Sequence, residues 1–321
     1  MEQLHGIFAA LADPTRLRIL LLVRELELSM GELAEVLDQS QPRVSRHVRI
    51  LAEAGLVRRH REGAWVFVRA GSRAGPGLFA LIGDFAAGAD LIGAERVRLA
   101  QVRSGRQRLA DLWFAEHAEE WDRMRALQGS DSAVEGRLVA LARGRGVGRL
   151  LDIGTGTGRI LELLGPDADD CVGIDRSPDM LRIARAKLDA TGLARAEVRQ
   201  SDMSALPFAS ACFDTVAMHH VLHFADDPAA AIREAARVLA PGGQLLLVDY
   251  ARHDHEELRT RFRHARLGFA QGDIARWFAD SGLRLEAEAA EAGPELTVTI
   301  WHGLRAGVSQ EPRRERLEAQ A

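Results

Sequence analysis

The stretch of sequence that decides the fold reads Leu150-Leu151-Asp152-Ile153-Gly154-Thr155-Gly156-Thr157-Gly158. Its first four residues predict a short buried strand, and the glycines that follow predict a tight turn into a helix over residues 159–164. Glycine lacks the side chain that would hold a ligand away from the backbone, so such a turn lets backbone N–H groups approach a nucleotide. By itself, this pattern is a weak indication of nucleotide binding.

The next predicted strand, residues 171–174, strengthens this interpretation because it ends in Asp175. A carboxylate at this position can accept hydrogen bonds from both hydroxyls of a ribose. A dinucleotide-binding fold is the competing interpretation. Its fingerprint requires glycine or alanine three residues after the second glycine, where this chain has Arg159. The glycine pattern therefore argues against a dinucleotide.

The run from Asp152 to Gly158 resembles the nucleotide loop of class I S-adenosylmethionine-dependent methyltransferases. Three further stretches resemble the same family in the same order: Ser201-Asp202-Met203, residues 213–223 and residues 237–248. Together they cover residues 149–250. The resemblance implies an α/β fold with a Rossmann-like, seven-stranded sheet. A helix over 273–281 and strands over 283–288 and 296–302 would complete it.

This resemblance also implies a cofactor, S-adenosyl-L-methionine, and a role for each matching residue. Asp152 and the glycines would hold its methionine end, Asp175 the ribose, and Asp202 with Met203 the adenine. The full set of expected cofactor-binding residues is Asp152, Gly154, Gly156, Gly158, Asp175, Asp202, Met203 and His219.

No catalytic residue can be assigned from the sequence, because positioning alone can supply most of the acceleration of an in-line methyl transfer. His219, His220 and His223 could serve as a general base or as metal ligands. The sequence shows no carboxylate partner for them, so we interpret them as residues that border the cofactor and assign no metal site. Cys171 and Cys212 are the only cysteines; they exclude a disulfide framework and are interpreted as buried, inert thiols.

The N-terminal part has a different character, because residues 39–69 carry seven arginines against Glu53 and Glu62 in a chain of net charge −4. This local charge indicates contact with a polyanion, although a solvated basic face would have the same composition. Asp13-Pro14 predicts a helix start. Helices are also predicted over residues 30–37 and from a cap at Ser40 to Ala54. The last of these helices turns arginines away from its apolar face, as a recognition helix in the major groove requires.

A hairpin is predicted after this helix, with strands over residues 56–61 and 65–69 about a glycine turn. Such a hairpin would form a wing on the phosphate backbone or in the minor groove. The predicted DNA-binding residues on the helix and the wing are Gln41, Arg43, Ser45, Arg46, His47, Arg49, Arg59 and Arg61.

Residues 3–70 resemble the ArsR/SmtB family of bacterial repressors, through residues 9–20, 40–47 and 54–57. The resemblance implies a winged helix-turn-helix, a homodimer, and a near-palindromic operator in double-stranded DNA that is released when a ligand binds. Many members sense metals through cysteines in the third helix. Residues 30–37 contain no cysteine, so no metal site is carried over.

The length of 321 residues predicts about two domains and a connector. We expect a winged helix-turn-helix over 1–72, a helical connector over 73–145, the methyltransferase fold over 146–305 and a charged tail over 306–321. The connector would form the dimer interface, and its residues 113–125 would cover the cofactor domain. With no membrane-spanning stretch and no secretory start, we expect a cytoplasmic protein with no membrane contact.

Two functions follow from this organisation. In the first, a DNA-binding transcription regulator carries a methyltransferase that methylates a small molecule. In the alternative, the second domain is a non-catalytic sensor of S-adenosylmethionine or S-adenosylhomocysteine that controls DNA binding. The undamaged cofactor motifs slightly favour the enzyme. An open polar pocket formed by residues 113–125, 219–224 and 250–269 would also favour it, and a closed apolar one the sensor.

Overall fold

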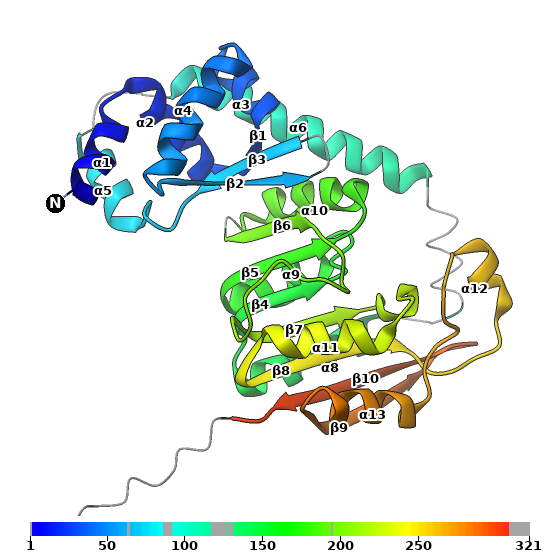
Figure 1. Cartoon of the computed structure of the whole chain (residues 1–321). Coiled ribbons are helices and arrows are strands. Elements are labelled where there is room, and N and C mark those ends of the chain that lie inside the picture. Colours follow the sequence, from blue (N-terminus) through cyan, green and yellow to red (C-terminus); the bar gives the residue numbers. More distant parts are fainter. Residues whose placement is uncertain are drawn as a thin grey trace, which may run out of the picture. The chain divides into compact units, whose positions relative to one another are not determined.

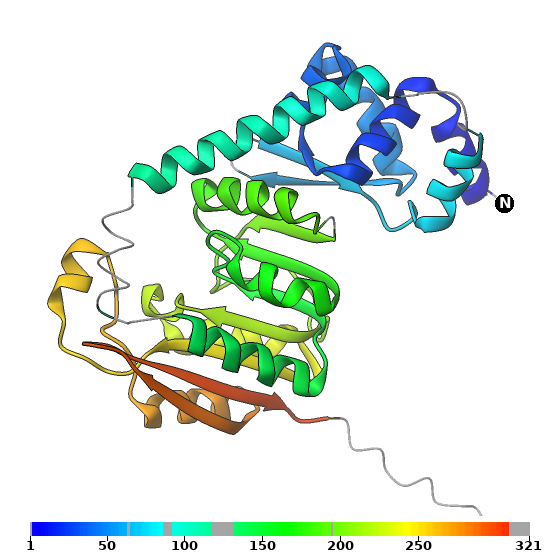
Figure 2. The ribbon, with the colours of Figure 1, turned by 180° about the vertical axis from the view of Figure 1, so that it is seen from behind.

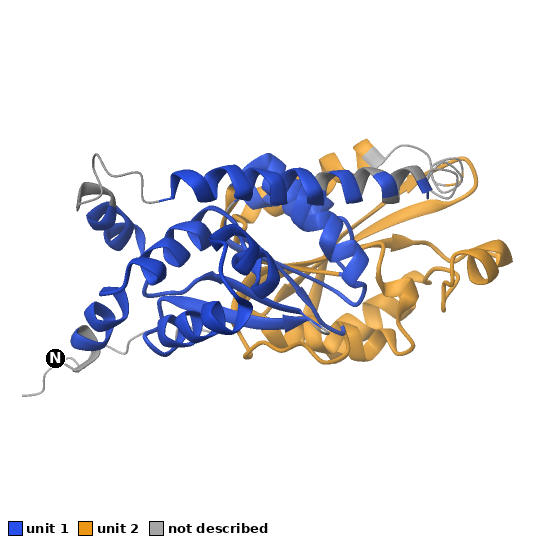
Figure 3. Cartoon of the chain, turned by 90° about the horizontal axis from the view of Figure 1, so that it is seen from above, with its two compact units in different colours: residues 1–124, 154–166, 170–202 blue, residues 125–153, 167–169, 203–321 orange. Residues whose placement is uncertain are grey.

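The computed structural model describes residues 2–62, 65–85, 92–116, 127, 131–193 and 195–307. The chain forms two compact units (Figure 3). Unit 1 comprises residues 1–124, 154–166 and 170–202, and unit 2 comprises residues 125–153, 167–169 and 203–321. The division runs through the segment expected to form one C-terminal domain, so the domain limits given above remain predictions.

Unit 1 begins with the predicted winged helix-turn-helix, a set of short helices over a small sheet. Its elements are α1 (Glu2–Leu11), α2 (Pro14–Glu25), β1 (Leu28–Ser29), α3 (Met30–Leu37), α4 (Gln41–Glu53), β2 (Val57–Glu62) and β3 (Trp65–Ala70). The three strands pair in the order β1-β3-β2. The helix starts follow from capping chemistry: the Asp13 side chain accepts a hydrogen bond from the backbone of Arg16, and Ser29 and Glu32 form a capping box. Ser40 stands at the start of α4, where its side chain makes no capping hydrogen bond.

Two connector helices follow the wing, α5 (Pro76–Phe85) and α6 (Gly93–Glu116). Leu99 on α6 is buried in the core of the winged helix-turn-helix. Val97, Leu109 and Leu112 of the same helix are exposed. One face of α6 therefore packs into the core of the winged helix-turn-helix, while another presents apolar side chains. The predicted cover over residues 113–125 lies for the most part outside the described residues.

The predicted seven-stranded sheet is present, with strand order β6-β5-β4-β7-β8-β10-β9. Its strands are β4 (Gly148–Ile153), β5 (Ala168–Asp175), β6 (Ala196–Gln200), β7 (Phe213–His219), β8 (Leu239–Tyr250), β9 (Leu283–Ala292) and β10 (Thr297–Arg305). The pairs β5–β6, β4–β7 and β7–β8 are parallel, and β10 runs antiparallel to both β8 and β9. Each strand expected from the sequence is found, and β9 and β10 extend beyond the predicted ends. The α/β fold class is confirmed.

Helices cover both faces of the unit 2 strands (Figures 1 and 2). Helix α8 (Asp131–Arg145) packs on one face, and α11 (Pro228–Val238) with α13 (Gln271–Asp280) packs on the other. The core between these layers includes the fully buried Tyr250, Phe278 and Trp301. Gly303 on β10 allows the close approach of α13, because a Cβ there would lie 2.6 Å from the Phe278 ring. The short α12 (Glu256–Arg261) and the 3-10 turn η2 (Leu222–Phe224) flank the sheet.

In unit 1, two further helices belong to the glycine-loop segment: α9 (Arg159–Leu164) and α10 (Pro178–Thr191). Helix α10 begins three residues after Asp175, with Ser177 as its cap. It contacts α6 along its length, as Figure 1 shows. The predicted charged tail over residues 306–321 lies outside the described residues from 308 onward. None of the helices in the described part of the chain has the length and hydropathy that crossing a membrane requires.

Candidate cofactor site and DNA-binding face

The glycine loop of unit 1 adopts the backbone conformation for which glycine is suited. Gly154, Gly156 and Gly158 have φ values of 72°, 51° and 84°, a region that other residues rarely adopt. The loop is anchored to β5, because the backbone N–H of Thr155 donates to the carbonyl of Ile174 at 2.8 Å. At Gly158 a Cβ would lie 3.3 Å from Ala184 of α10, so the loop and this helix approach closely.

Asp175 ties this loop to the start of α10. Its Oδ2 accepts a hydrogen bond from the backbone N–H of Gly156 at 2.9 Å, and its Oδ1 accepts one from Ser177 at 2.8 Å. Burial raises the pKa of the Asp175 carboxyl, against the lowering effect of these two hydrogen bonds. The structure thus brings together two residues that the sequence predicted to share one site.

Asp202 is placed near the same end of the sheet. It follows β6, and its carboxylate lies 3.6 Å from the guanidinium of Arg176. The backbone N–H of Ser201 donates to the carbonyl of Asp175 at 3.0 Å. Asp175 pairs in register with Gln200, two residues before Asp202. Both acids therefore lie at the carboxyl edge of β5 and β6, where parallel sheets bind ligands.

The remaining predicted cofactor residues belong to unit 2. Asp152 is buried in β4 and pairs in register with Ala217 of β7. Met203 and His219 are partly exposed. Ile153, the last residue of β4, pairs with Met218, so His219 lies at the end of the strand beside the one that leads into the glycine loop.

Beside His219, the structure forms a histidine cluster that the sequence did not predict. We define it as His220, His223, His253 and His264 with Asp249 and Tyr250. The His223 Nδ1 lies 2.8 Å from Asp249 Oδ1, and the Asp249 carboxylate also accepts hydrogen bonds from the backbone of His223 and Tyr250. The sequence interpretation that these histidines lack a carboxylate partner is therefore wrong for His223. Its partner is 26 residues away in the chain, at the end of the neighbouring strand β8.

The rings of this cluster are closely packed and mostly uncharged. His264 stacks on His223 with ring centroids 3.9 Å apart, and His220 lies 4.8 Å from Tyr250. Burial, followed by the nearby His223, lowers the pKa of His264 to about 3. Burial also holds the pKa of His220 well below its usual value. Burial opposes ionisation of Asp249, but the interactions with His223 and the other donors outweigh it and lower the Asp249 pKa.

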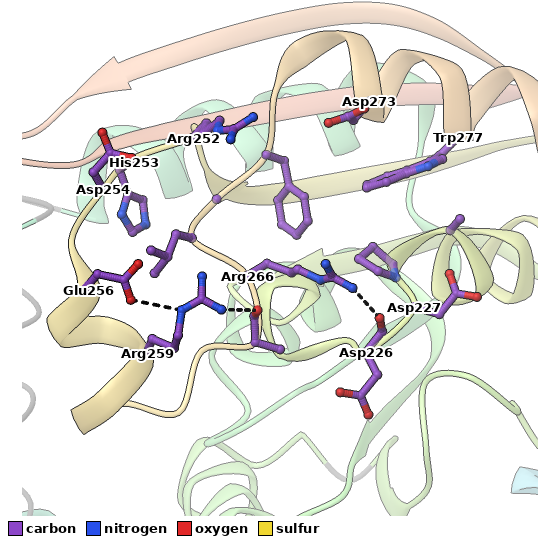
Figure 4. A pocket seen from close by; sticks show the side chains of 16 residues that line it. Asp226, Asp227, Arg252, His253, Asp254, Glu256, Arg259, Arg266, Asp273 and Trp277 are labelled. Atoms are coloured by element: carbon purple, nitrogen blue, oxygen red, sulfur yellow. Dashed lines mark hydrogen bonds and ion pairs between the residues drawn. The ribbon is translucent and has the colours of Figure 1, made fainter.

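A pocket of about 810 Å³ opens in unit 2 next to this cluster (Figure 4). Acidic side chains gather in its lining together with three arginines: Asp226, Asp227, Asp254, Glu256, Asp273, Arg252, Arg259 and Arg266. Phe269 and Trp277 add aromatic surface. His253 lines the pocket, and its ring centroid is 5.9 Å from that of Tyr250, so the pocket and the histidine cluster share a wall. The lining includes residues of the predicted 250–269 segment but none of the predicted residues 219–224, and residues 117–125 lie outside the described residues.

The DNA-binding residues predicted on α4 are mostly on its outer face. Gln41, Arg43, Ser45, Arg46 and Arg49 are exposed, while Val44, Val48 and Leu51 are buried in the core. His47 differs, because it is only partly exposed and its Nδ1 lies 3.7 Å from Asp13. Burial lowers the pKa of His47 despite the nearby Asp13 carboxylate. On the wing, Arg59 and Arg61 are exposed, and the turn at residues 63 and 64 lies outside the described residues.

The opposite face of the wing is held by buried ion pairs to α10. Arg185 of α10 donates to Glu62 at the end of β2, to Glu27 Oε2 at 3.2 Å and to the carbonyl of Val198 at 3.0 Å. Its guanidinium lies 3.7 Å above the ring of Phe67 in β3. Arg185 and Glu62 are 6% and 3% exposed, so this pairing is inside the unit.

A second arginine makes a similar link from α6. Arg106 donates to both carboxylate oxygens of Glu32, to Asp189 of α10 at 2.9 Å and to the carbonyl of Glu27 at 2.9 Å. Burial raises the pKa of Asp189 to about 6, against the lowering effect of Arg106. We call the contacts of Arg106 and Arg185 the arginine network.

Within this region, Glu27, His60 and Glu197 place one ligand atom each within 4.8 Å of one another, a spacing that could suit a metal ion. Arginines already bind these carboxylates, however: Arg69 and Arg199 donate to Glu197, and Arg185 donates to Glu27. A divalent cation would have to compete with these guanidinium groups, so we assign the group to the ionic network and not to a metal.

Comparison with known proteins defines the two parts of the chain. Residues 13–59 match the family model of the bacterial regulatory proteins of the arsR family, and residues 151–247 match that of a methyltransferase domain. The chain therefore joins an ArsR-type helix-turn-helix to a methyltransferase domain, as the sequence predicted. Both matches fall on the segments whose geometry is described above.

Individual relatives agree with this division. The arsenical resistance operon repressor of Escherichia coli is 50% identical over 64 residues, which are 20% of this chain and 55% of the repressor. The demethylmenaquinone methyltransferase of Thermus thermophilus is 38% identical over 143 residues, which are 43% of this chain and 64% of the enzyme. The chain thus spans about half to two thirds of the length of these relatives.

Among solved structures, a chain from the complex between the Haloferax volcanii Trm112 methyltransferase activator and a methyltransferase is similar in fold. It is 20% identical, with 61% of this chain and 97% of that chain covered and a TM-score of 0.50. At this identity the likeness supports the fold alone.

Proposed function

We propose that the protein is a transcription regulator that binds operator DNA through α4 and the wing, and that its methyltransferase domain transfers a methyl group from S-adenosyl-L-methionine to a small molecule. The observation that carries the proposal is the contact between Asp175 and Gly156, because it joins the glycine loop to an acidic residue at the carboxyl end of β5. The relatives named above include both a repressor and a methyltransferase, which supports the same combination.

The residues present fit the cofactor. Each carboxylate oxygen of Asp175 accepts one backbone hydrogen bond and retains a lone pair for a ribose hydroxyl. Side chains are missing at Gly154 and Gly156, where a ligand would approach the backbone. Asp152 and the glycines would hold the methionine end, Asp202 and Met203 the adenine, and His219 would border the site. The cofactor supplies an electrophilic methyl group, and the protein supplies binding and orientation.

Binding of the cofactor is tested by isothermal titration with S-adenosylmethionine and S-adenosylhomocysteine. We expect the wild type to bind both and Asp175→Asn to lose about tenfold or more in affinity, because hydrogen bonds from ribose hydroxyls to a charged acceptor contribute about 1.5–3 kcal/mol. Asp179→Asn is the matched control, since Asp179 is an exposed acid in the first turn of α10. Equal affinity of the two variants would show that Asp175 has no role in binding.

A second candidate function, a sensor that reports cofactor binding to the DNA, is favoured by the arginine network. Arg185 bonds to the wing and stands on α10, the helix whose first turn is tied to Asp175 through Ser177. A ligand at Asp175 that shifts α10 would therefore act on the wing. Such coupling requires that the ligand bind the DNA-competent and DNA-incompetent states with different affinity.

The protein is further proposed to act as a homodimer. The apolar side chains of Val97, Leu109 and Leu112 are exposed on α6, the helix that the ArsR resemblance assigns to the dimer interface. Light scattering of the full chain tests this proposal. We expect a dimer for the wild type and a monomer for Leu112→Glu. Trp65→Glu serves as the control, because Trp65 is an exposed apolar residue outside the connector.

A further inference from the structure

We propose that His223, held by Asp249, is the general base of the methyltransferase domain and that the methyl acceptor is a planar molecule with an acidic hydroxyl, such as a phenol or an enol. This inference rests on the proposed methyltransferase function and adds the acceptor class and the residue that removes its proton.

The pairing with Asp249 fixes which nitrogen of His223 can act as a base. Asp249 accepts from both the ring and the backbone N–H of His223. Since an ionised carboxylate can only accept, Nδ1 of His223 must carry the hydrogen, so Nε2 is the nitrogen that has a lone pair in the neutral ring. The same arrangement of a buried carboxylate behind an imidazole orients the base in other hydrolytic and transfer enzymes.

The surroundings of His223 do not offer it a second charged partner. The titratable groups of the described chain that interact with His223 are Asp249, His220, His253 and His264; Asp254 and His255 act on His253. Burial lowers the pKa values of His220, His253 and His264, so these rings are neutral at pH 7. Asp249 is therefore the one anion within the set that interacts with His223, and it is already committed to that ring.

The cluster also contains polar atoms that a ligand would satisfy. His264 is 3% exposed, and its buried Nδ1 has no hydrogen-bond partner among the described residues. Both ring nitrogens of His220 are likewise buried without such a partner, and His220 has a φ of 51°. Burying an unsatisfied polar group costs about 1–3 kcal/mol, and left-handed backbone at a residue other than glycine adds to this cost. Such features concentrate at ligand sites.

The location of the cluster suits methyl transfer. His220 and His223 follow β7, and Asp249 and Tyr250 end β8, so the cluster lies at the carboxyl edge of these parallel strands. At the same edge, Met218 of β7 pairs with Ile153, the residue before Gly154 of the glycine loop. His253 belongs to the cluster and also lines the charged pocket, so a polar acceptor bound in the pocket would lie beside the cluster.

Flat rings line the cluster and indicate a flat acceptor. Phe224 is half exposed and lies 4.2 Å from His223 and 5.2 Å from His264, measured between ring centroids. Tyr250 stacks with His264 at 5.9 Å. Phe224 is the exposed ring of this group, so an aromatic or enolic acceptor can stack on it beside His223.

The chemistry balances without a further reactant. The hydroxyl proton of the acceptor moves to Nε2 of His223 as the oxygen forms its bond to the methyl carbon. The C–S bond breaks with its electron pair on sulfur, which removes the positive charge of the sulfonium. His223 then releases the proton to solvent, so each turnover produces one methyl ether and one proton.

Proton uptake can be measured without turnover by titrating the protein with 4-nitrophenol at pH 6, where the free compound is mostly the colourless phenol. We expect the wild type to bind the compound as the yellow phenolate. We expect no yellow absorbance from His223→Asn, whose amide can still donate to Asp249. His255→Asn is the matched control, because His255 also lies near a carboxylate, Glu295 at 3.6 Å, and is not a member of the cluster. Its contact with His253 through the backbone N–H is kept by asparagine.

Turnover is then measured with radiolabelled S-adenosylmethionine and a series of para-substituted phenols of increasing acidity. We expect His223→Asn to lose roughly 10²-fold or more in kcat on the weakly acidic phenols and much less on 4-nitrophenol, which can ionise unaided. In wild type, the pH at which transfer is half-maximal should be the same for all phenols.

Several outcomes would overturn the inference. A half-maximal pH in wild type that follows each phenol's own acidity would show that no protein base acts, and this measurement does not depend on any variant folding. An equal loss on every phenol in His223→Asn would indicate a structural role, and absence of transfer or phenolate binding would exclude this acceptor class. Failure of wild type to bind S-adenosylmethionine by calorimetry would instead reject the proposed function itself.

Discussion

Arg185 illustrates how single residues hold unit 1 together. Its guanidinium is buried, bonded to two carboxylates and a carbonyl, and stacked on Phe67. A planar group with five donors can satisfy several acceptors at once, which a lysine could not. The sequence could not reveal this role, because Arg185 is one of many arginines and its partners Glu27 and Glu62 are more than 100 residues away in the chain.

Arg185→Met should destabilise the protein by about 3–5 kcal/mol, because it leaves the buried Glu62 carboxylate without its cation. Urea unfolding followed by circular dichroism would measure the change. Arg182 lies on the same helix and pairs with the exposed Asp179 at 3.3 Å. Arg182→Met should therefore change the free energy of unfolding by less than about 1 kcal/mol. Adding Glu62→Gln to Arg185→Met should recover part of the loss; a further loss would contradict this account.

His264 makes stability depend on pH. Its pKa is about 3 in the folded chain and near 6.5 in the unfolded chain, so below pH 6.5 the unfolded state binds more protons. The stabilising contribution is present above pH 6.5 and is lost as the pH falls toward 3, at about 1 kcal/mol per pH unit. Unfolding by urea at pH 7 and pH 5.5 should show this decrease, and it should be smaller in His264→Asn. An equal decrease in both proteins would assign it to other groups.

At the scale of elements, the hairpin of β2 and β3 has two faces with different tasks. His60 and Glu62 alternate with Arg59 and Arg61 along β2, so the first pair faces α10 while the second pair faces outward. The two short runs on either side of a glycine turn made the hairpin and its arginines predictable from sequence. Which partner the inward face meets depends on long-range packing and was not predictable.

Arg59→Ala should weaken DNA binding about uniformly across sequences and should reduce the slope of log affinity against log salt by about 1, as expected for a phosphate contact. The measurement is fluorescence anisotropy on the DNA upstream of the gene at several salt concentrations. Arg58→Ala is the matched control, since Arg58 is exposed but lies on the other face of β2. The same loss of slope in both variants would mean that the effect is one of net charge.

The sheet shows what local patterns can and cannot establish. Its strands and the glycine loop follow from short apolar runs and turn residues, so their order along the chain was predictable. The histidine cluster was not, because Asp249 at the end of β8 and His264 in the following loop meet His223 only once the strands are paired. The one signal available was an acidic residue at the carboxyl end of a strand, Val248-Asp249-Tyr250, next to a histidine-rich segment.

At the scale of the whole molecule, the arginine network predicts that cofactor and DNA affect one another's binding. Coupling between sites is commonly about 5- to 150-fold and must be reciprocal. The factor by which S-adenosylmethionine changes the dissociation constant for operator DNA should therefore equal the factor by which that DNA changes cofactor affinity. Glu62→Gln should reduce both factors together, while Glu53→Gln, an exposed acid on α4, should leave them unchanged. Absence of coupling in the wild type, or coupling intact in Glu62→Gln, would exclude transmission through Arg185.

The buried partners of Arg185 and Arg106 also bear on whether the chain can be divided. Glu27, Glu62 and Phe67 lie in the segment that resembles a free-standing repressor, and Arg185 and Asp189 lie in the segment that resembles a free-standing methyltransferase. Separating the two segments would break these ion pairs and leave unpaired charged groups on the surface of each segment. We therefore expect a chain cut at the junction to give two fragments, each less stable than the same segment in the full chain.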